Sequence, residues 1–283
     1  MGYKTKVDWC DSTWNPVTGC LHGCAYCYAR RIAERFGARE IYDPECQRQR
    51  HLIERGMLTG TGKPLELDYP WEQKNKDGSI TNAAYPFGFS PTFHRYKLDE
   101  PQHWKKPRTI FVCSMADLFG DWVPDEWIEQ VFKACEAAPQ HRYMFLTKNP
   151  ARFKQLRKNG IKLPNYCWIG TSVTRDAEQA DQYTGRTGYL SENWDTTAQW
   201  FVSVEPILER MSRSSIENLT AMNWVIVGAE TGSRKGKVVP RKEWIDEIAA
   251  ECKRCRTPIF MKDSLRGLMG ADFKQEFPWE EKP

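Results

Sequence analysis

The sequence predicts an α/β fold built on a parallel sheet. From residue 106 onward, short runs of β-branched and aromatic residues alternate with stretches of helical character. Each run is nearly all apolar, which is typical of a strand buried on both faces. Strands that alternate with helices form parallel sheets, because each helix returns the chain to the edge where the next strand begins. The pattern fits a doubly wound sheet and a barrel equally well.

In chain order, a first strand is expected near Lys6–Thr13, followed by an insertion at 38–106. The insertion is rich in Gly, Pro, aromatic and charged residues, and we expect loops and short helices there, without strands. Six further strands are predicted at Arg108–Ser114, Arg142–Thr147, Tyr166–Val173, Gln199–Glu205, Asn223–Ala229 and Pro258–Lys262. Helices are predicted at Pro124–Ala138, Pro150–Lys158, Asp176–Gln182 and Arg241–Cys252. Residues 264–283 are expected to form a surface tail with one short helix, so that residues 1–283 make a single domain.

The composition disfavours secretion and membrane insertion. The chain has 283 residues and a net charge of +4, and its longest apolar stretch runs only from Trp224 to Ala229. A membrane span needs about 20 apolar residues, and the N-terminus has no apolar core of a signal peptide. We therefore expect a cytoplasmic protein without a membrane partner, whose ten cysteines are thiols or ligands rather than disulfides.

Positive charge is concentrated in two segments. Eight Lys or Arg and no acidic residue lie between Ala137 and Arg175, and five more basic residues lie between Thr231 and Lys242, again without an acid. Such segments are either solvated helix faces or loops that bind a polyanion.

Three cysteines lie close together at Cys20, Cys24 and Cys27, with the spacing C-x3-C-x2-C. A short loop interrupted by glycines has no interior in which to bury thiols, so a ligand set is indicated. Soft thiolates bind iron–sulfur clusters and zinc. Three ligands leave one iron of a four-iron cluster open, whereas zinc would need a remote fourth ligand. His22 lies between the cysteines, which is a poor position for closing a zinc tetrahedron.

Polar residues follow the apolar runs at six successive strand ends. They are Ser114 with Asp117, Thr147 with Lys148, Thr171 with Ser172, Glu205, Glu230 with Thr231, and Lys262 with Asp263. Any one of them can be a helix cap or a loop residue. Because function collects at the carboxyl ends of parallel strands, the recurrence favours a binding site.

The cysteine spacing, with Tyr26 as an aromatic residue before the last cysteine, resembles the signature of radical S-adenosylmethionine (SAM) enzymes. The string GCLHGCAYCYAR is similar to the cluster loop of the spore photoproduct lyase family. The strings WNPVTGC, HWKKPRTIFVCSMADLF and VGAETG resemble a phage-associated radical SAM family, and this resemblance covers most of the chain. The resemblance implies a partial (β/α) barrel with the cluster loop after the first strand.

The resemblance also implies cofactors and residue roles. Cys20, Cys24 and Cys27 would bind a [4Fe-4S] cluster, whose open iron takes SAM, and an external one-electron reductant would supply the electron. Cleavage of SAM then yields a 5′-deoxyadenosyl radical that takes hydrogen from the substrate. The expected cofactor-binding residues are Tyr26, Ser114, Asp117, Lys148, Ser172, Glu205 and Glu230. The family's usual Gly-Gly-Glu motif is replaced by residues 114–117, Ser-Met-Ala-Asp.

Two other cysteine features have alternative interpretations. Cys113 ends a predicted strand and is the candidate catalytic hydrogen donor, although a small buried hydrophobic residue is the commoner role of such a cysteine. Cys252 and Cys255 form a C-x2-C pair at a helix end, with no second pair nearby.

Three classes of function remain open from the sequence. The first is a radical SAM enzyme that modifies or repairs a nucleic-acid base or nucleotide, or that acts on a small metabolite or a protein side chain. The second is a non-catalytic zinc-binding protein that interacts with nucleic acid, and the third is an electron-transfer module.

Overall fold

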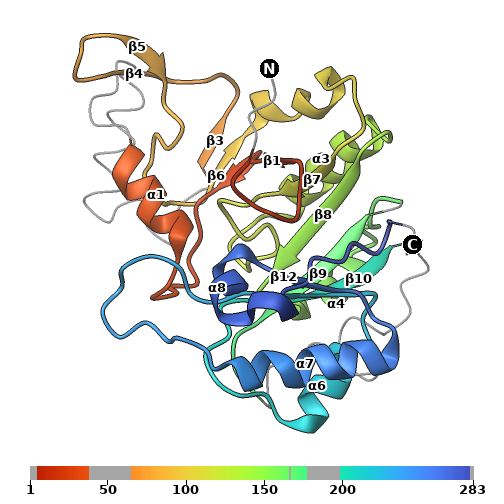
Figure 1. Ribbon diagram of the computed structural model, residues 1–283. Helices are drawn as coiled ribbons and strands as arrows, with labels where there is room; N and C mark the ends of the chain where they lie inside the picture. The colour runs from red at the N-terminus through yellow and green to blue at the C-terminus, as the bar shows by residue number, and fades with distance from the viewer. Residues whose placement is uncertain (1–4, 38–64, 166, 177–197, 281–283) are drawn as a thin grey trace. The chain divides into compact units, whose positions relative to one another are not determined.

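The computed structural model describes residues 5–37, 65–165, 167–176 and 198–280 and has an α/β fold (Figure 1). Its main sheet has seven strands in the order β1-β7-β8-β9-β10-β11-β12. Strand order therefore follows chain order from one edge to the other. A doubly wound sheet reverses direction at a switch point, which this order lacks. The singly wound order confirms the predicted partial parallel barrel and decides between the two architectures that periodicity left open.

The strands of the main sheet are short. They are β1 (Ser12–Trp14), β7 (Thr109–Val112), β8 (Arg142–Thr147), β9 (Trp168–Val173), β10 (Gln199–Val204), β11 (Trp224–Val227) and β12 (Ile259–Met261). The α-helices are α1 (Tyr28–Phe36), α3 (Asp125–Glu136), α4 (Ala151–Lys158), α6 (Arg213–Leu219), α7 (Lys242–Cys255) and α8 (Arg266–Met269). Short 3-10 helices occur at Arg95–Lys97, Glu100–His103, Asp263–Leu265 and Gly270–Asp272.

The chain divides into two compact units. The first, here called the sheet unit, comprises Met1–Ser12, Pro107–Ile110 and Gln140–Pro283. The second, here called the cysteine unit, comprises Thr13–Lys106 and Phe111–Pro139. Each unit is described by itself below.

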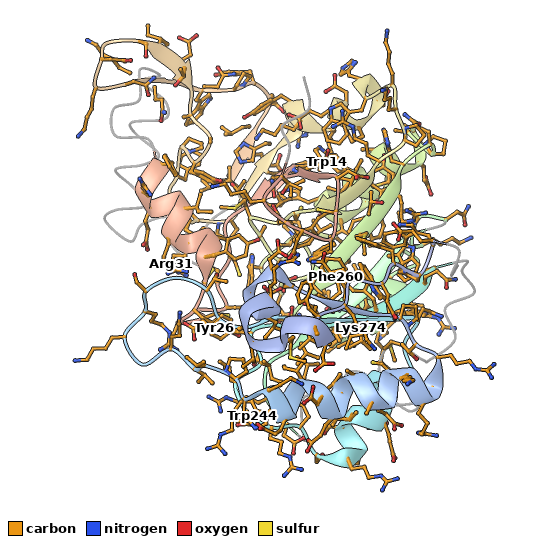
Figure 2. All side chains as sticks on the ribbon, viewed as in Figure 1. Trp14, Tyr26, Arg31, Trp244, Phe260 and Lys274 are labelled. Atoms are coloured by element: carbon orange, nitrogen blue, oxygen red, sulfur yellow. The ribbon has the colours of Figure 1, made fainter. Side chains whose placement is uncertain are left out.

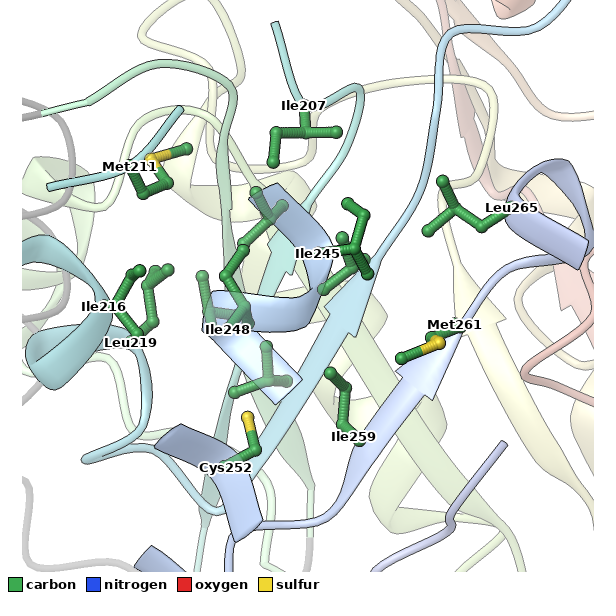
Figure 3. Close-up of a cluster of buried hydrophobic side chains, with 14 of the residues drawn as sticks. Ile207, Met211, Ile216, Leu219, Ile245, Ile248, Cys252, Ile259, Met261 and Leu265 are labelled. Carbon is green, nitrogen blue, oxygen red and sulfur yellow. The ribbon is translucent and has the colours of Figure 1, made fainter. Parts of the chain in front are cut away.

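In the sheet unit, helices α6 and α7 pack on one face of β10, β11 and β12. Neighbouring strands are parallel, with Val204 opposite Val227 and Val227 opposite Met261. Helix α7 turns Ile245, Ile248 and Cys252 toward the sheet, at the spacing expected of one helix face. These side chains meet those of the strands in a buried cluster to which α6 also contributes (Figure 3).

The last part of the chain covers apolar side chains rather than forming a surface tail. Leu265 and Met269 are 0% and 2% exposed and belong to the buried cluster. Phe277 and Trp279 lie against Trp224, with ring centroids 5.8 and 5.2 Å away. The surface-tail prediction for 264–283 is therefore wrong, although its one short α-helix is present as α8.

The cysteine unit contains strands that the sequence did not predict. Strands β2 (Val17–Thr18), β6 (Thr92–His94) and β3 (Leu65–Leu67) form a small sheet in the order β2-β6-β3. A hairpin pairs β4 (Glu72–Lys74) with β5 (Ile80–Asn82). The expectation of no strand in 38–106 is thus wrong within its described part. Strands this short span too little sequence for alternation to be recognised.

Most other predicted elements are confirmed within a few residues. The six later strands all form, and the helices expected after Pro124, Pro150 and Arg241 correspond to α3, α4 and α7. The first strand lies later than expected, at Ser12–Trp14. Helices α1 and α6 were missed, and the helix expected at Asp176–Gln182 falls almost wholly outside the described residues. Within the described part of the chain, none of the helices has the length and apolar character that crossing a membrane requires.

Candidate functional site

The three clustered cysteines lie on the loop between β2 and α1, within the cysteine unit. The loop begins at Gly19, whose φ of +85° lies in the left-handed region and whose N–H donates to the Met115 carbonyl at 2.9 Å. A Cβ at this position would lie 2.2 Å from the Ser90 carbonyl oxygen, so only glycine fits. Cys20 then follows with its N–H on the Phe89 carbonyl at 3.2 Å. The first thiol is therefore positioned by backbone contacts from two other segments.

The third cysteine begins helix α1. Cys27 is the N-cap, and its sulfur accepts a hydrogen bond from the Arg30 N–H at 3.3 Å. Its own N–H donates to the Cys24 carbonyl at 3.1 Å. The Arg30 guanidinium donates to the Cys20 carbonyl at 3.4 Å and lies over the Phe89 ring. The N-cap and first turn of α1 thus form hydrogen bonds with Cys20, Cys24 and Cys27. A helix N-terminus also favours the thiolate form of a cysteine placed there.

Tyr26 and Arg31 flank this helix start. Figure 2 shows Tyr26 on the loop that leads into α1 and Arg31 on the helix itself. The phenol ring of Tyr26 is half-buried. Tyr26 directly precedes the N-cap cysteine in the chain, and its contact with a cofactor stays a prediction.

Burial dominates the electrostatics of the first thiol. It raises the pKa of Cys20 to about 12, and the neighbouring Asp117 carboxylate and the other two thiols act in the same direction. The protein without metal therefore holds this sulfur as a neutral thiol at pH 7. A metal centre that binds it must displace the proton, which couples metal affinity to pH.

The donor chemistry of the loop fits an iron–sulfur cluster or zinc, because both take thiolates. Cys20, Cys24 and Cys27 are all free thiols and half-buried, and Cys20 interacts electrostatically with the other two. Among the described residues, no three or more His, Cys, Asp or Glu side chains lie close enough together to hold a metal ion as they stand.

The imidazole of His22, between the first two cysteines, bonds to a buried carboxylate. Its Nε2 lies 2.7 Å from Asp117 Oδ2, and the two side chains are 21% and 6% exposed. The other oxygen, Asp117 Oδ1, accepts the Phe119 N–H at 3.0 Å. The rings of His22 and Trp122 are nearly perpendicular, with centroids 4.9 Å apart. Asp117 was predicted to bind a cofactor, and both of its oxygens are occupied by protein donors.

Cys113 and Ser114, which directly follow β7, have different environments. The hydroxyl of Ser114 donates to Asn15 Oδ1 at 3.2 Å, and its carbonyl accepts from the Tyr28 hydroxyl at 2.6 Å. Cys113 is 2% exposed, and burial raises the pKa of its thiol to about 12. A buried, protonated thiol is compatible with hydrogen donation and equally with simple packing, so its catalytic role stays a prediction.

The remaining predicted residues belong to the sheet unit. Lys148 directly follows β8, Ser172 lies within β9, and Glu205 directly follows β10. Ser172 is half-buried and is paired in register with Ser203 of β10. Glu205 accepts a hydrogen bond from the Lys262 ammonium, with Oε1 and Nζ 2.6 Å apart.

Glu230, on the loop after β11, is bound by an arginine of the same loop. Its two oxygens accept from Arg234 Nε and Nη2 at 2.6 and 2.7 Å, and its side chain is 2% exposed. This bidentate bond lowers the pKa of Glu230. Lys237 Nζ reaches the Gly232 carbonyl at 3.1 Å, so two of the basic side chains stabilise the loop.

The contacts that order the cysteine loop were not predicted from the sequence. Asn15, which we did not select, accepts from both the Ser114 hydroxyl and the Met115 N–H. The pair of His22 with Asp117 joins residues 95 positions apart. No spacing rule reveals such pairs, and the one signal in the sequence was an Asp shortly after a strand.

The two cysteines of the C-x2-C pair, Cys252 and Cys255, lie in different environments. Cys252 is buried in the core of the sheet unit, and Cys255 is exposed, with its thiol 3.6 Å from Glu251 Oε1.

Taken together, the fold and the loop define an α/β protein with a singly wound parallel sheet and a three-cysteine loop. The model of the family described as "Protein of unknown function (DUF5131)" matches residues 4–267, and the chain belongs to this family. No curated protein matches the sequence.

Several solved structures of spore photoproduct lyase are remotely similar to the chain. A mutant with dinucleoside spore photoproduct has a TM-score of 0.49 at 10% identity, over 93% of this chain and 79% of that one. A second mutant, with bound AdoMet and dinucleoside spore photoproduct, has a TM-score of 0.48 at 9% identity, over 92% and 78%. At this level the likeness carries no argument about activity or substrate.

Proposed function

We propose that the protein is a radical SAM enzyme. The observation that carries the proposal is the loop itself: three thiols spaced C-x3-C-x2-C lie between β2 and the N-terminus of α1. Thiolates at this spacing suit an iron–sulfur cluster, and the helix N-terminus stabilises negative charge on the ligand set. When bound, the cluster and SAM would together supply a carbon radical that takes a hydrogen atom from the substrate.

In this proposal the chain's own residues bind the cluster and position SAM. Cys20, Cys24 and Cys27 hold the cluster in this proposal, and Tyr26 contributes an aromatic contact to SAM. Lys148 binds the SAM carboxylate, Ser172 donates a hydrogen bond to its polar groups, and Ser114, whose hydroxyl proton is used toward Asn15, accepts one from its amino group or ribose hydroxyls. These assignments follow the sequence resemblance.

The three predicted carboxylates fall into two groups. Asp117 and Glu230 have both oxygens bonded to protein N–H groups, so we propose that each of them orders its own loop rather than binding a cofactor directly. Glu205 uses one oxygen toward Lys262, and we keep it as a ligand contact.

For the substrate we propose a nucleic-acid base or a nucleotide. The support is the two basic segments noted in the sequence. The first, between residues 137 and 175, includes α4, and the second, between residues 231 and 242, forms part of the loop before α7. Within the latter, Lys235 and Arg241 form no ion pair with the described residues. Cations that are not neutralised by the protein can bind phosphates.

Anaerobic reconstitution with iron and sulfide tests the proposal. We expect about four irons and four sulfides per chain, a broad visible absorption that changes when SAM is added, and 5′-deoxyadenosine after reduction. The same assay with and without oligonucleotides tests the substrate class, because a correct substrate accelerates SAM cleavage. One colourless metal ion per chain would instead establish a zinc protein, and a cluster that never cleaves SAM would establish an electron-transfer module.

A further inference from the structure

A second group of charged side chains lies at the carboxyl edge of the sheet unit, on strands β10, β11 and β12. Glu205, Gly228 and Lys262 each come directly after the last residue of one of these strands. Their strands are in register, with the Gly228 N–H on the Val204 carbonyl at 3.1 Å and the Lys262 N–H on the Val227 carbonyl at 2.9 Å. The three residues therefore form one row across the edge where parallel sheets place their ligands.

Glycine in the middle of this row lets the two charged side chains meet. Lys262 Nζ lies 2.6 Å from Glu205 Oε1, across the middle strand. A Cβ on residue 228 would lie 3.0 Å from Lys262 Cδ and 3.2 Å from Glu205 Cδ, closer than such contacts normally are. The absence of a side chain at Gly228 is thus a condition for the pair.

Asp8 lies next to Lys262 and adds a second carboxylate to the Glu205–Lys262 pair. Its Oδ1 lies 4.0 Å from Lys262 Nζ, is buried, and has no hydrogen-bond partner in the part of the chain that the structure describes. Its Oδ2 accepts the Asp263 N–H at 2.8 Å. Burial alone would lower the pKa of Lys262, but Glu205 and Asp8 outweigh burial and the net shift is upward. The ammonium is therefore charged at neutral pH.

The parts of this charged group that solvent can reach are a hydrogen-bond acceptor, the Glu205 carboxylate, and a neighbouring donor, the Lys262 ammonium. The side chains of Glu205 and Lys262 are 26% and 20% exposed, so solvent reaches both. Glu205 Oε2 has no hydrogen-bond partner among the described residues, and an ammonium has three N–H donors, of which the pair uses one. The group as a whole has two carboxylates and one ammonium. Its net negative charge disfavours phosphate and carboxylate ligands, and the partly accessible Lys262 ammonium disfavours cations.

We propose that Glu205 and Lys262 bind a neutral, planar ligand edge that carries an N–H next to a carbonyl oxygen or a ring nitrogen, as nucleobases do. Glu205 accepts from the N–H, and Lys262 donates to the neighbouring acceptor. Both bonds are charge-assisted, which makes them about twice as strong as neutral ones. The base can come from a nucleoside-containing cofactor or from a substrate, since uracil, guanine and adenine all present such an edge.

Binding of nucleosides to the metal-free protein tests the site without the cluster, so it can fail while the proposed function holds. Uridine, guanosine and adenosine are titrated by calorimetry, with N3-methyluridine as the matched ligand that lacks the N–H. We expect at least one nucleoside to bind. Adenosine alone points to the cofactor as the source, and uridine or guanosine points to a substrate.

Three variants of the row probe the protein side of the contact. Lys262→Met and Glu205→Met keep side-chain length and remove one partner each, and each should weaken binding by about tenfold or more. Gly228→Ala keeps both charges and should weaken binding by pushing the pair apart. Glu247→Gln, which breaks the exposed pair with Arg210 in the same unit, is the control and should bind as the wild type does.

Circular dichroism establishes that each variant is folded before it is titrated. Three results would overturn the proposal: no nucleoside binds the wild-type protein at millimolar concentration, uridine binds but N3-methyluridine binds equally well, or folded Lys262→Met and Glu205→Met bind unchanged.

Discussion

His22 Nε2 lies 2.7 Å from Asp117 Oδ2, and this bond connects the cysteine loop to the segment that follows β7. The carboxylate is nearly inaccessible, so water competes weakly for it. A hydrogen bond to a charged group contributes about 1.5–3 kcal/mol when its partner is buried. The pair therefore limits the positions that the loop between Cys20 and Cys24 can adopt.

We expect His22→Ala to loosen this loop without unfolding the chain. A cluster reconstituted in the variant should lose iron to a chelator severalfold faster than in the wild type, because the thiolates are less well positioned. Release is followed by the absorbance of the iron–chelator complex. His103→Ala is the matched control, since His103 makes an exposed pair with Asp99. Equal rates of iron release in all three proteins would show that the bond does not order the ligands.

Changing Cys20, Cys24 or Cys27 to Ala should abolish stable iron loading, because each thiolate binds a different iron of the cluster. Iron and sulfide content after anaerobic reconstitution measures the effect. Cys255→Ala, at the exposed end of α7, should load as the wild type does. Loss of iron in Cys255→Ala together with retention in Cys20→Ala would place the metal elsewhere.

Lys148→Ala should weaken SAM binding and leave iron content unchanged, since it removes a charged partner of the SAM carboxylate and no metal ligand. Removal of one charge-assisted hydrogen bond corresponds to roughly tenfold to a hundredfold in affinity. Equilibrium binding of SAM to the reconstituted protein provides the measurement, with Lys253→Ala on α7 as the control. Unchanged affinity would assign Lys148 to an ordinary loop position.

The sequence predicted local features better than contacts between distant residues. The apolar runs placed β8 and the five other later strands because each is continuous and buried on both faces. Strands β3 and β6 have three residues each, and they are held by pairing with a distant segment that leaves no periodic signal.

The same limit applies to the site. The three thiols were recognised because their spacing is local. The bond of Lys262 to Glu205 spans 57 positions and depends on Gly228, a residue whose contribution is the side chain that it lacks. The contact between Lys262 and Glu205 forms only when β10, β11 and β12 lie side by side. The sequence therefore identified each strand end separately, but not the contact between the two side chains.

His94 predicts an acid-sensitive stability of the cysteine unit. It is fully buried, Nε2 lies 2.8 Å from Thr18 Oγ1, and burial, aided by Lys97, lowers its pKa to about 3. The unfolded chain takes up a proton near the ordinary pKa of about 6.5, whereas the folded chain does not. The contribution of His94 to the free energy of unfolding is therefore fully present above pH 6.5 and is lost as the pH falls toward 3. Between pH 8 and pH 5 the free energy of unfolding decreases by about 2 kcal/mol.

Urea unfolding at several pH values measures this effect. His94→Gln should be less stable at pH 8 and should show a shallower decline between pH 8 and pH 5, because the proton-binding group is gone. His103→Gln, which changes an exposed histidine, should keep the wild-type slope. A wild-type slope in His94→Gln would mean that other groups cause the acid sensitivity.

The basic loop before α7 makes a prediction about nucleic acid. Arg234 is neutralised by Glu230 through two hydrogen bonds, so its charge attracts a polyanion only weakly. Lys235 has no acidic partner among the described residues, and Lys237 donates only to a backbone carbonyl within them. If the loop contacts phosphates, these two lysines carry the interaction together with Arg241, the N-cap of α7.

We expect the wild-type protein to bind duplex DNA with an affinity that falls steeply with salt, because phosphate contacts release counterions. Replacing Lys235 and Lys237 by Ala should reduce the log–log slope by roughly 0.9 for each phosphate that the variant no longer neutralises. Lys242→Ala is the control, since Lys242 pairs with Asp246 and Asp272. Fluorescence anisotropy at increasing salt measures all three proteins. Absence of binding at about 50 mM salt would exclude the polyanion interpretation of this loop and favour a small-molecule or protein substrate.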